Sequence, residues 1–195
     1  GLDLLKGQGA NDIIFGDNAE LDFLDDVVSS ALSGGVTRAP GNGNNDEIHG
    51  GLDDDVLVGG TADDDIYGNA GADVIVGDQG EFVFVASEIS SFKTTDGGAV
   101  EYGDDTIDGN AGTDTLVGGL GGDTIHGNEG IDVIVGDGVE IDITARVATQ
   151  ITSIDTSNGG ADKLRTRTLH RALLERIAEH HWIACFLRDA GPFGI

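Results

Sequence analysis

The sequence has few of the residues that usually stabilise a small domain. Its 195 residues include no methionine, one cysteine (Cys185), two prolines, one tryptophan, two tyrosines and seven phenylalanines. A single cysteine excludes an internal disulfide framework, and no run is long and apolar enough to span a bilayer. No N-terminal secretory signal is visible. We therefore expect a fragment of a larger protein, without membrane insertion, that uses another stabilising device, such as a bound metal.

Basic residues are also scarce. Ten Lys and Arg stand against 36 Asp and Glu, which gives a formal net charge of −26. Nucleic acid is an unsuitable partner because its binding needs a basic footprint, and cations are the natural counterpart of this charge. The sequence contains no G-x-S-x-G, H-E-x-x-H or Walker-type lysine motif. We expect no enzymatic activity from this chain.

Glycine and aspartate are abundant and recur with a period of nine residues. If aspartate is position 6, that column is Asp3, Asp12, Asp46, Asp55, Asp64, Asp73, Asp105, Asp114, Asp123, Asp132 and Asp162. Position 8 is always Leu or Ile, and position 1 of the complete units is always glycine. Fixed periodicity of this kind indicates a repeat architecture in which each unit buries its apolar residue against its neighbours.

A longer period lies over the first. The segments GDNAELDF, GDQGEFVF and GDGVEIDI begin at Gly16, Gly77 and Gly136, a spacing of about 60 residues. Each opens an insert, near 20–40, 81–100 and 139–156, in which apolar and polar residues alternate. This alternation predicts three β-hairpins that project from the main body, although 21–32 in the first insert could instead hold a helical turn.

The nonapeptide predicts rows of carboxylates. Each unit has a six-residue turn and a three-residue strand, so two units make one coil and successive turns on one edge lie two units apart. Coils stack about 4.8 Å apart, and two unit charges at that spacing repel by roughly 3–4 kcal/mol at an effective dielectric constant of 20. A hard divalent cation between coils would reverse this repulsion. Calcium suits such oxygen-rich sites better than magnesium, and zinc would require His or Cys ligands.

The repeats GGLGGDTIH, GNEGIDVIV and GGLDDDVLV resemble the calcium-binding nonapeptide of RTX (repeats-in-toxin) proteins, G-G-x-G-x-D-x-U-x. The resemblance covers residues 1–165. It implies an all-β fold, a right-handed parallel β-roll solenoid with the hairpins as inserts. It also implies type I export to the bacterial surface or exterior, with folding on calcium binding outside the cell.

The resemblance also implies a ligand set and about six or seven Ca²⁺ ions. The turn at 50–55 should share an ion with 68–73, 41–46 with 59–64, 109–114 with 127–132, and Asp105 with 118–123. The turns at 59–64 and 118–123 should also meet the closing turns of Asp78 and Asp137, and one further site is expected near Asp12 and Asp17. The implied ligands are Asp12, Asp17, Asp46, Asp55, Asp64, Asp73, Asp78, Asp105, Asp114, Asp123, Asp132, Asp137, Gly41, Gly43, Gly50, Gly59, Gly68, Gly109, Gly118 and Gly127.

Residues 166–195 form a different segment. The chain becomes basic there, and Leu169, Leu173 and Ile177 recur at i, i+4, which predicts a helix that ends before Gly191-Pro192. Three interpretations remain open for this tail: a cap on the end of the roll, foreign sequence, or part of an export signal.

Two functions are compatible with the sequence. The first is a calcium-binding structural module of a large exported surface or adhesin-like protein, whose adhesion target is unknown; the 60-residue period favours it. The alternative is the accessory export and folding region of a secreted RTX toxin or hydrolase, with its catalytic domain upstream. Ice binding is disfavoured because position 4 carries no ladder of Thr and Asn.

Overall fold

The structure is a computed structural model in which every element is a β-strand. It describes residues 2–17, 19–23, 32–37, 43–85, 88–95, 103–144, 147–153, 163–165, 172–177 and 181–186. These ranges contain no helix, in agreement with the predicted all-β fold class. In particular, the described part of the chain offers no helical segment suited to crossing a bilayer.

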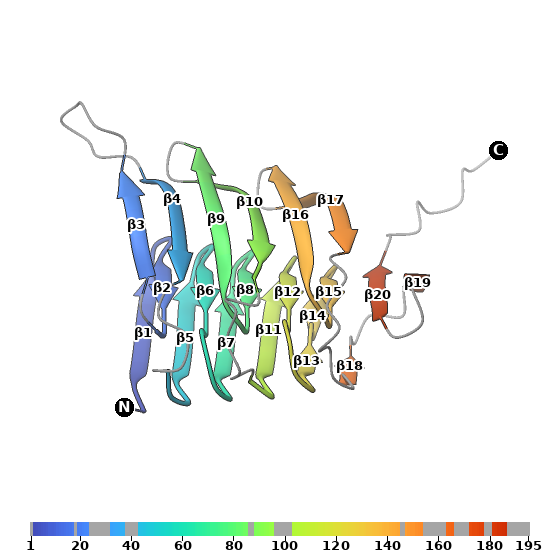
Figure 1. The fold of residues 1–195 in the computed structure, drawn as a ribbon, viewed down its shortest axis with the longest axis horizontal. Coiled ribbons are helices and arrows are strands. Elements are labelled where there is room, and N and C mark those ends of the chain that lie inside the picture. Colours follow the sequence, from blue (N-terminus) through green and yellow to red (C-terminus); the bar gives the residue numbers. More distant parts are fainter. Residues whose placement is uncertain are drawn as a thin grey trace.

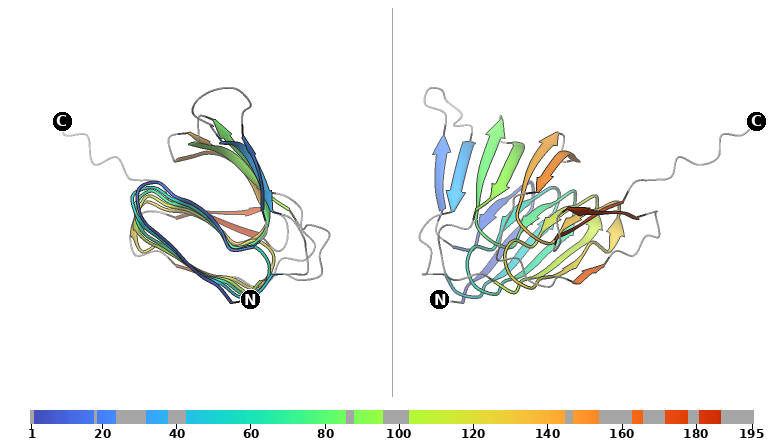
Figure 2. Two further views of the ribbon diagram at one scale, coloured as in Figure 1. Left: turned by 90° about the vertical axis from the view of Figure 1, so that its left-hand side faces the viewer. Right: turned by 45° about the vertical axis from the view of Figure 1, so that its right-hand side comes forward.

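Two parallel sheets, together called the roll below, hold the nonapeptides (Figures 1 and 2). The polar sheet has the order β1 (Leu4–Gly9), β5 (Glu47–Leu52), β7 (Asp65–Ala70), β11 (Thr106–Gly112), β13 (Thr124–His126) and β18 (Lys163–Arg165), with β14 (Glu129–Gly130) also on β11. The apolar sheet has the order β2 (Ile13–Phe15), β6 (Val56–Val58), β8 (Val74–Val76), β12 (Thr115–Val117), β15 (Val133–Val135), β20 (His181–Phe186) and β19 (Ala172–Ile177). The chain alternates between the two sheets, as a β-roll requires.

The aliphatic residues of position 8 form the core between these sheets. Parallel pairing aligns them in register, for example Ile48 with Ile66 and Ile66 with Ile107. Their side chains are completely buried, and each contributes roughly 1.5–3 kcal/mol by leaving water. The buried set is Ile48, Leu57, Ile66, Ile75, Ile107, Leu116, Ile125 and Ile134, with Leu5 and Ile14 packed against it at the first coil.

The two sheets differ in the residues that point away from this core. In the polar sheet these positions carry side chains such as those of His49 and Tyr67, which stack with ring centroids 4.8 Å apart. In strands β6, β8 and β15 of the apolar sheet they are valines, as at Val56 and Val74, which are both fully buried. A parallel strand that is apolar on both faces must be covered on both faces. The apolar sheet therefore needs a second layer.

The three inserts provide that layer. As predicted, each insert forms a hairpin, and the strands are β3 (Ala19–Phe23), β4 (Leu32–Thr37), β9 (Gly80–Val85), β10 (Glu88–Thr94), β16 (Val139–Thr144) and β17 (Val147–Ser153). Beyond the prediction, the hairpins also pair with one another. β4 pairs with β9, and β10 pairs with β16, so one antiparallel six-stranded sheet, the hairpin sheet, runs beside the roll (Figure 1).

A second hydrophobic core joins the hairpin sheet to the apolar sheet. Phe82 and Phe84 of β9 are buried, whereas Val83 and Val85 between them are exposed, as the twofold alternation of a strand requires. Phe82 packs between two other aromatic rings, with centroids 5.7 Å from Phe15 and 6.1 Å from Phe92. The buried members are Val56, Val58, Val74, Val76, Phe82, Phe84, Ile89, Phe92, Val117, Val135, Val139, Ile141 and Ile143.

The hairpins can pair because their spacing matches that of the coils. One hairpin leaves the roll for every two coils, and each hairpin contributes two strands to the hairpin sheet. Coils and strands are both separated by about 4.8 Å, the distance of a backbone hydrogen-bond ladder. Successive hairpins therefore arrive within pairing distance of one another.

The predicted helical tail is wrong for the residues that are described. β19 and β20 form an antiparallel hairpin, and β20 pairs antiparallel with β15 at the last coil. Residues at i and i+4 share a face in a strand as well as in a helix, so the spacing of Leu173 and Ile177 did not distinguish the two. The edge of β15 supplies backbone partners for a strand. The helical turn considered for the first insert falls largely on 24–31, which lie outside the described residues, and 19–23 are a strand.

Candidate metal centre

Aspartate side chains link each coil to the next along both edges of the roll. In every case the backbone N–H of a position-6 aspartate donates to the Oδ1 atom of the position-6 aspartate one coil further on, at 2.7 to 3.2 Å. One ladder, called the intact edge because none of its turns contains an insert, is Asp12, Asp55, Asp73, Asp114 and Asp132. The other, called the split edge because hairpins interrupt alternate turns, is Asp3, Asp46, Asp64, Asp105 and Asp123.

The position-1 glycines face the second oxygen of these carboxylates. A Cβ on Gly68 would collide with Asp73 Oδ2 and would lie 2.8 Å from the carbonyl oxygen of Gly109, one coil further on. The absence of a side chain thus leaves a cradle with a carboxylate oxygen and a carbonyl oxygen from adjacent coils. Eight described glycines share this arrangement: Gly7, Gly16, Gly50, Gly59, Gly68, Gly77, Gly109 and Gly118.

Several cradles contain buried carboxylate oxygens that accept no hydrogen bond from the described residues. The Oδ2 atoms of Asp64, Asp105 and Asp114 are buried and accept no hydrogen bond from any described residue, although these side chains are each only 1% exposed. A buried polar atom without a partner costs on the order of 1–3 kcal/mol, and more if it is charged. Because the neighbouring carbonyl oxygens are also acceptors, such a site needs a bound cation, a proton or a hydrogen-bond donor from outside the chain.

The electrostatics support this interpretation. Burial is the main cause that raises the pKa of Asp64 to about 8, and the carboxylates of Asp46, Asp17 and Asp78 contribute to the same shift. Burial likewise raises the pKa of Asp114 to about 8, with contributions from Asp73 and Asp132. Without a cation, ionised carboxylates are therefore costly in this fold.

The donor set fits calcium. Oxygen ligands from side chains and backbone, on glycine turns that admit close approach, are those of a hard cation with flexible coordination. Among the described residues, no three His, Cys, Asp or Glu side chains converge on one point. That is expected here, because each cradle combines one carboxylate oxygen with a backbone carbonyl oxygen of the next coil.

The predicted turn pairs are adjacent in the structure. The backbone N–H of Asp55 donates to the Asp73 carboxylate, that of Asp46 to Asp64, that of Asp114 to Asp132 and that of Asp105 to Asp123. The turns at 59–64 and 118–123 also meet their closing turns, since Gly60 donates to the Gly77 carbonyl and Gly119 to the Gly136 carbonyl, both at 2.8 Å. Gly41 lies outside the described residues.

The site expected between Asp12 and Asp17 does not form as predicted. Asp12 belongs to the intact edge, where its N–H donates to Asp55 Oδ1. Asp17 lies across β2 on the split edge, and its Oδ2 accepts from the N–H and the hydroxyl of Thr61 at 2.7 and 2.8 Å. One short strand separates the two aspartates in the sequence, and a strand crosses the roll from one edge to the other.

The closing-turn aspartates have a hydrogen-bonding role that the sequence did not reveal. Asp78 resembles Asp17, because its Oδ2 accepts from the backbone of Leu120 in the next coil and its Oδ1 accepts from Gly103. Burial raises the pKa of Asp78 to about 7 despite these bonds. Asp137 occupies the equivalent place in the third block and is 4% exposed. Near Asp17, a Cβ on Gly43 would collide with the Asp17 carboxylate and the Thr61 hydroxyl.

Sequence reasoning also missed some glycines and an outer aspartate ladder. Gly7, Gly16 and Gly77 form cradles, and their nonapeptide register could have identified them. At position 5, Asp54 Oδ1 accepts from Ala72 N–H, and Asp104 Oδ1 accepts from Gly122 N–H, both at 2.8 Å. The Asp-Asp pairs in the sequence are the signal for this ladder, which lies beside the cradles rather than in them.

Two departures from the repeat pattern are accommodated. Asp53 and Ala62 replace the fourth-position glycine, and both adopt left-handed backbone conformations with φ of 72° and 77°. Such a conformation costs roughly 1–2 kcal/mol for a residue with a Cβ. The coils nevertheless remain stacked, and Ala10 N–H donates to Asp53 Oδ2 at 3.1 Å.

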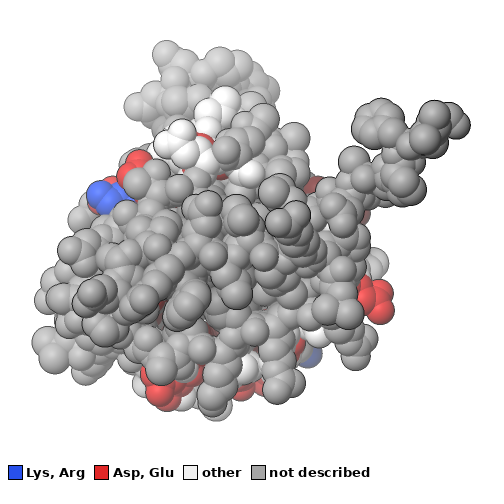
Figure 3. Space-filling view, turned by 90° about the vertical axis from the view of Figure 1, so that its right-hand side faces the viewer, with Lys and Arg blue, Asp and Glu red and all other residues white. Residues whose placement is uncertain are grey.

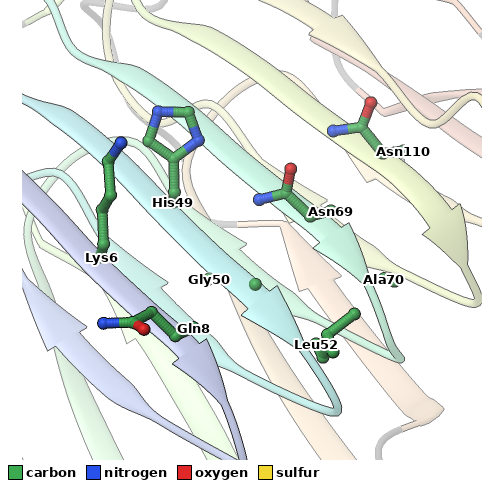
Figure 4. Close-up of a pocket in the computed structure, with 9 residues that line it drawn as sticks. Lys6, Gln8, His49, Gly50, Leu52, Asn69, Ala70 and Asn110 are labelled. Carbon is green, nitrogen blue, oxygen red and sulfur yellow. The ribbon is translucent and has the colours of Figure 1, made fainter.

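A surface pocket on the polar sheet is chemically different from the cradles. Figure 4 shows side chains from β1, β5, β7 and β11 around it, and none carries a carboxylate. It is therefore unsuited to a hard cation. Its lining is Lys6, Gln8, His49, Gly50, Gly51, Leu52, Asn69, Ala70 and Asn110.

The charged surface agrees with an affinity for cations. Seen from the C-terminal end of the roll, acidic atoms are far more extensive than basic atoms among the coloured residues (Figure 3). This matches the excess of 36 acidic over 10 basic residues in the chain. Such a field attracts cations before they reach a specific site.

Comparison with known proteins identifies the repeats. The family model of the RTX calcium-binding nonapeptide repeat, which spans four copies of the repeat, matches residues 1–19, 49–81, 101–125 and 117–138. The chain thus carries repeats of the RTX calcium-binding nonapeptide family, as the sequence predicted, and repeats of this family bind calcium. No curated protein and no solved structure matches the chain.

Proposed function

We propose that this chain is a non-enzymatic, calcium-dependent structural module of a large exported bacterial surface or adhesin-like protein. The observation that carries the proposal is the set of glycine cradles, in which carboxylate and carbonyl oxygens of adjacent coils converge; the buried Oδ2 atoms of Asp64, Asp105 and Asp114 accept no hydrogen bond there from a described residue. Calcium supplies the positive charge that such a site lacks. The implied ligands named above, with about six or seven ions, are our proposed ligand set, except that Asp12 and Asp17 would belong to separate sites on opposite edges of the roll.

The chain's own residues make folding depend on the cation. Each Oδ1 atom is already used to bond the backbone of the neighbouring coil, so the carboxylates cannot turn away from the cradles without breaking the ladder. With no cation, adjacent carboxylates repel by roughly 3–4 kcal/mol per pair. Binding free energy therefore becomes folding free energy. We infer that the chain stays unfolded in calcium-poor cytosol, is exported by a type I route and folds outside as a right-handed β-roll solenoid.

The continuity of the hairpin sheet supports a modular surface protein. Successive blocks of about 60 residues contribute hairpins that pair across the block boundaries, so further blocks could extend the same three sheets.

The alternative remains an accessory export and folding region of a secreted RTX toxin or hydrolase. The tail hairpin on β15 supports its interpretation as a cap at the end of the roll.

Far-ultraviolet circular dichroism during a calcium titration tests the proposal, with magnesium as the control ion. We expect a cooperative gain of β-signal at about 0.1–1 mM calcium, the range of extracellular modules, and little gain with magnesium. An equal response to magnesium, or a chain that is fully folded in chelator, would contradict a calcium-driven fold. Two or three blocks behind a hydrolase domain in the parent gene would favour the alternative.

A further inference from the structure

Hairpins interrupt alternate turns of the split edge, and we call these the split turns; two of them are considered below. In one of them Gly77 precedes the β9–β10 hairpin and Asp105 follows it. A Cβ on Gly77 would nevertheless collide with Asp105 Oδ2 and would lie 2.5 Å from the Gly118 carbonyl oxygen. The two ends of the hairpin thus meet in one cradle.

A second split turn has the same geometry. Gly16 precedes the β3–β4 hairpin and Asp46 follows it. A Cβ on Gly16 would lie 2.9 Å from Asp46 Oδ2 and 2.5 Å from the Gly59 carbonyl oxygen. Uninterrupted turns build the cradle within six consecutive residues, so the split turns reproduce it across an inserted hairpin.

The split cradle at Asp105 points to a ligand on independent grounds. The Asp105 side chain is 1% exposed, and its Oδ2 accepts no hydrogen bond from a described residue. Its Oδ1 is fixed by the N–H of Asp64 at 2.9 Å. The carboxylate is therefore held in place with its remaining buried oxygen directed into the cradle.

Among the described residues, the base of this hairpin is held by the β9–β10 ladder and by further hydrogen bonds beside it. Gly103 N–H donates to Asp78 Oδ1 at 3.4 Å, and Thr95 N–H donates to the Gln79 carbonyl at 3.0 Å. Asp78, on the segment that enters the hairpin, and Asp105, on the segment that leaves it, are both buried carboxylates. With no cation, their like charges push these two segments apart. In addition, closing this long loop costs more entropy than closing a six-residue turn.

We propose that a calcium ion in a split turn joins the chain segment that enters the hairpin to the segment that leaves it. Occupancy of this site then controls docking of the hairpin sheet onto the apolar sheet. In an uninterrupted turn the ion joins coils only. The inference rests on the proposed function, and it gives the split turns a role of their own, because they couple calcium to the second core, which contains Phe82 and Phe92.

Hydrogen exchange of the whole chain, followed by mass spectrometry along a calcium titration, tests this. The variants are Asp105→Asn in the split turn and Asp114→Asn in an uninterrupted turn, where the carboxylate is equally buried. In each protein, protection of β9 and β10 is compared with that of β8 and β12. We expect Asp105→Asn to raise the calcium midpoint for β9 and β10 by about tenfold or more relative to β8 and β12, and Asp114→Asn to shift all four strands together.

If Asp105→Asn shifts the calcium midpoint of β9 and β10 no more than that of β8 and β12, the inference is overturned. The unmodified protein provides a test that does not depend on a variant folding. If β9 and β10 are as protected in chelator as in calcium, while protection of β8 and β12 still rises with calcium, the inference fails and the proposed function stands. If calorimetry shows no calcium binding at all, the proposed function fails with it.

Discussion

Replacing Asp114 by asparagine should change stability with opposite signs in chelator and in calcium. Asp114 Oδ1 accepts the N–H of Asp73 at 3.0 Å, and the amide oxygen of asparagine can retain that bond. The amide nitrogen would take the place of Oδ2, beside the Gly127 carbonyl oxygen, where a donor is favourable. The substitution therefore removes one negative charge and leaves the backbone ladder in place.

The magnitude follows from the burial of the carboxylate. Burial raises the pKa of Asp114 from 3.8 to about 8, and four pKa units correspond to roughly 5 kcal/mol at 1.36 kcal/mol per unit. In chelator at pH 8 the variant escapes most of this cost, and we expect stabilisation of about 2–5 kcal/mol. In saturating calcium it lacks an anionic ligand and should be less stable than the unmodified protein.

Urea unfolding followed by circular dichroism, at pH 8 in chelator and in calcium, measures both effects. Asp54→Asn is the matched control, because it removes the same charge from the outer ladder while its Oδ1 can still accept from Ala72. We expect the control to change stability by less than about 1 kcal/mol in either condition. If Asp114→Asn shifts stability with the same sign in both conditions, the cradle is not a cation site.

Three further predictions concern pH and packing. In chelator, lowering the pH from 8 to 5 should increase the β-signal. Burial raises the pKa of Asp64 to about 8 in the folded state, whereas the unfolded carboxyl binds its proton only near pH 3.8, so protonation stabilises the folded state over this range. A β-signal that decreases as the pH is lowered would contradict this. Gly68→Ala should abolish one cradle and lower calcium stoichiometry in calorimetry, because its Cβ would meet Asp73 Oδ2, whereas Gly9→Ala meets only Leu52 Cβ at 4.0 Å and should be neutral. Phe92→Ala should cost about 3–5 kcal/mol in calcium, measured by urea unfolding, and a loss below about 1 kcal/mol would mean that the second core contributes little.

The repeat geometry could be predicted because it depends on local pattern. An aspartate with an aliphatic residue two places later, as in Asp55 and Leu57, fixes which face of a strand is buried and which edge carries the carboxylate. The stacking of Asp55 on Asp73 follows from the period alone. Hydrogen bonding of Asp17 and Asp78 to the next coil could not be predicted, because it depends on the side chains meeting a turn more than 40 residues away.

The hairpin sheet and the tail required information beyond local pattern. Alternation in the insert from Glu81 predicted a hairpin correctly, but not that its edges pair with the hairpins before and after it. The valines that flank Leu57 and Ile75 were the available signal, since strands that are apolar at all three positions need cover on both faces. In the tail, the spacing of Leu173 and Ile177 fits helix and strand equally, and the partner strand β15 decided the outcome.

The matched spacing of hairpins and coils has a consequence for fidelity of folding. Nearly identical nonapeptides can stack in many wrong registers, since a slip by one unit still buries an aliphatic residue at every position 8. Such a slip would move a hairpin to the opposite edge, where no hairpin exists to pair with it and the valine face stays uncovered. A slip by one full coil would separate neighbouring hairpins by an extra strand width. The hairpins therefore specify the register of an otherwise repetitive chain. Only in the native register can all three sheets form at the same time.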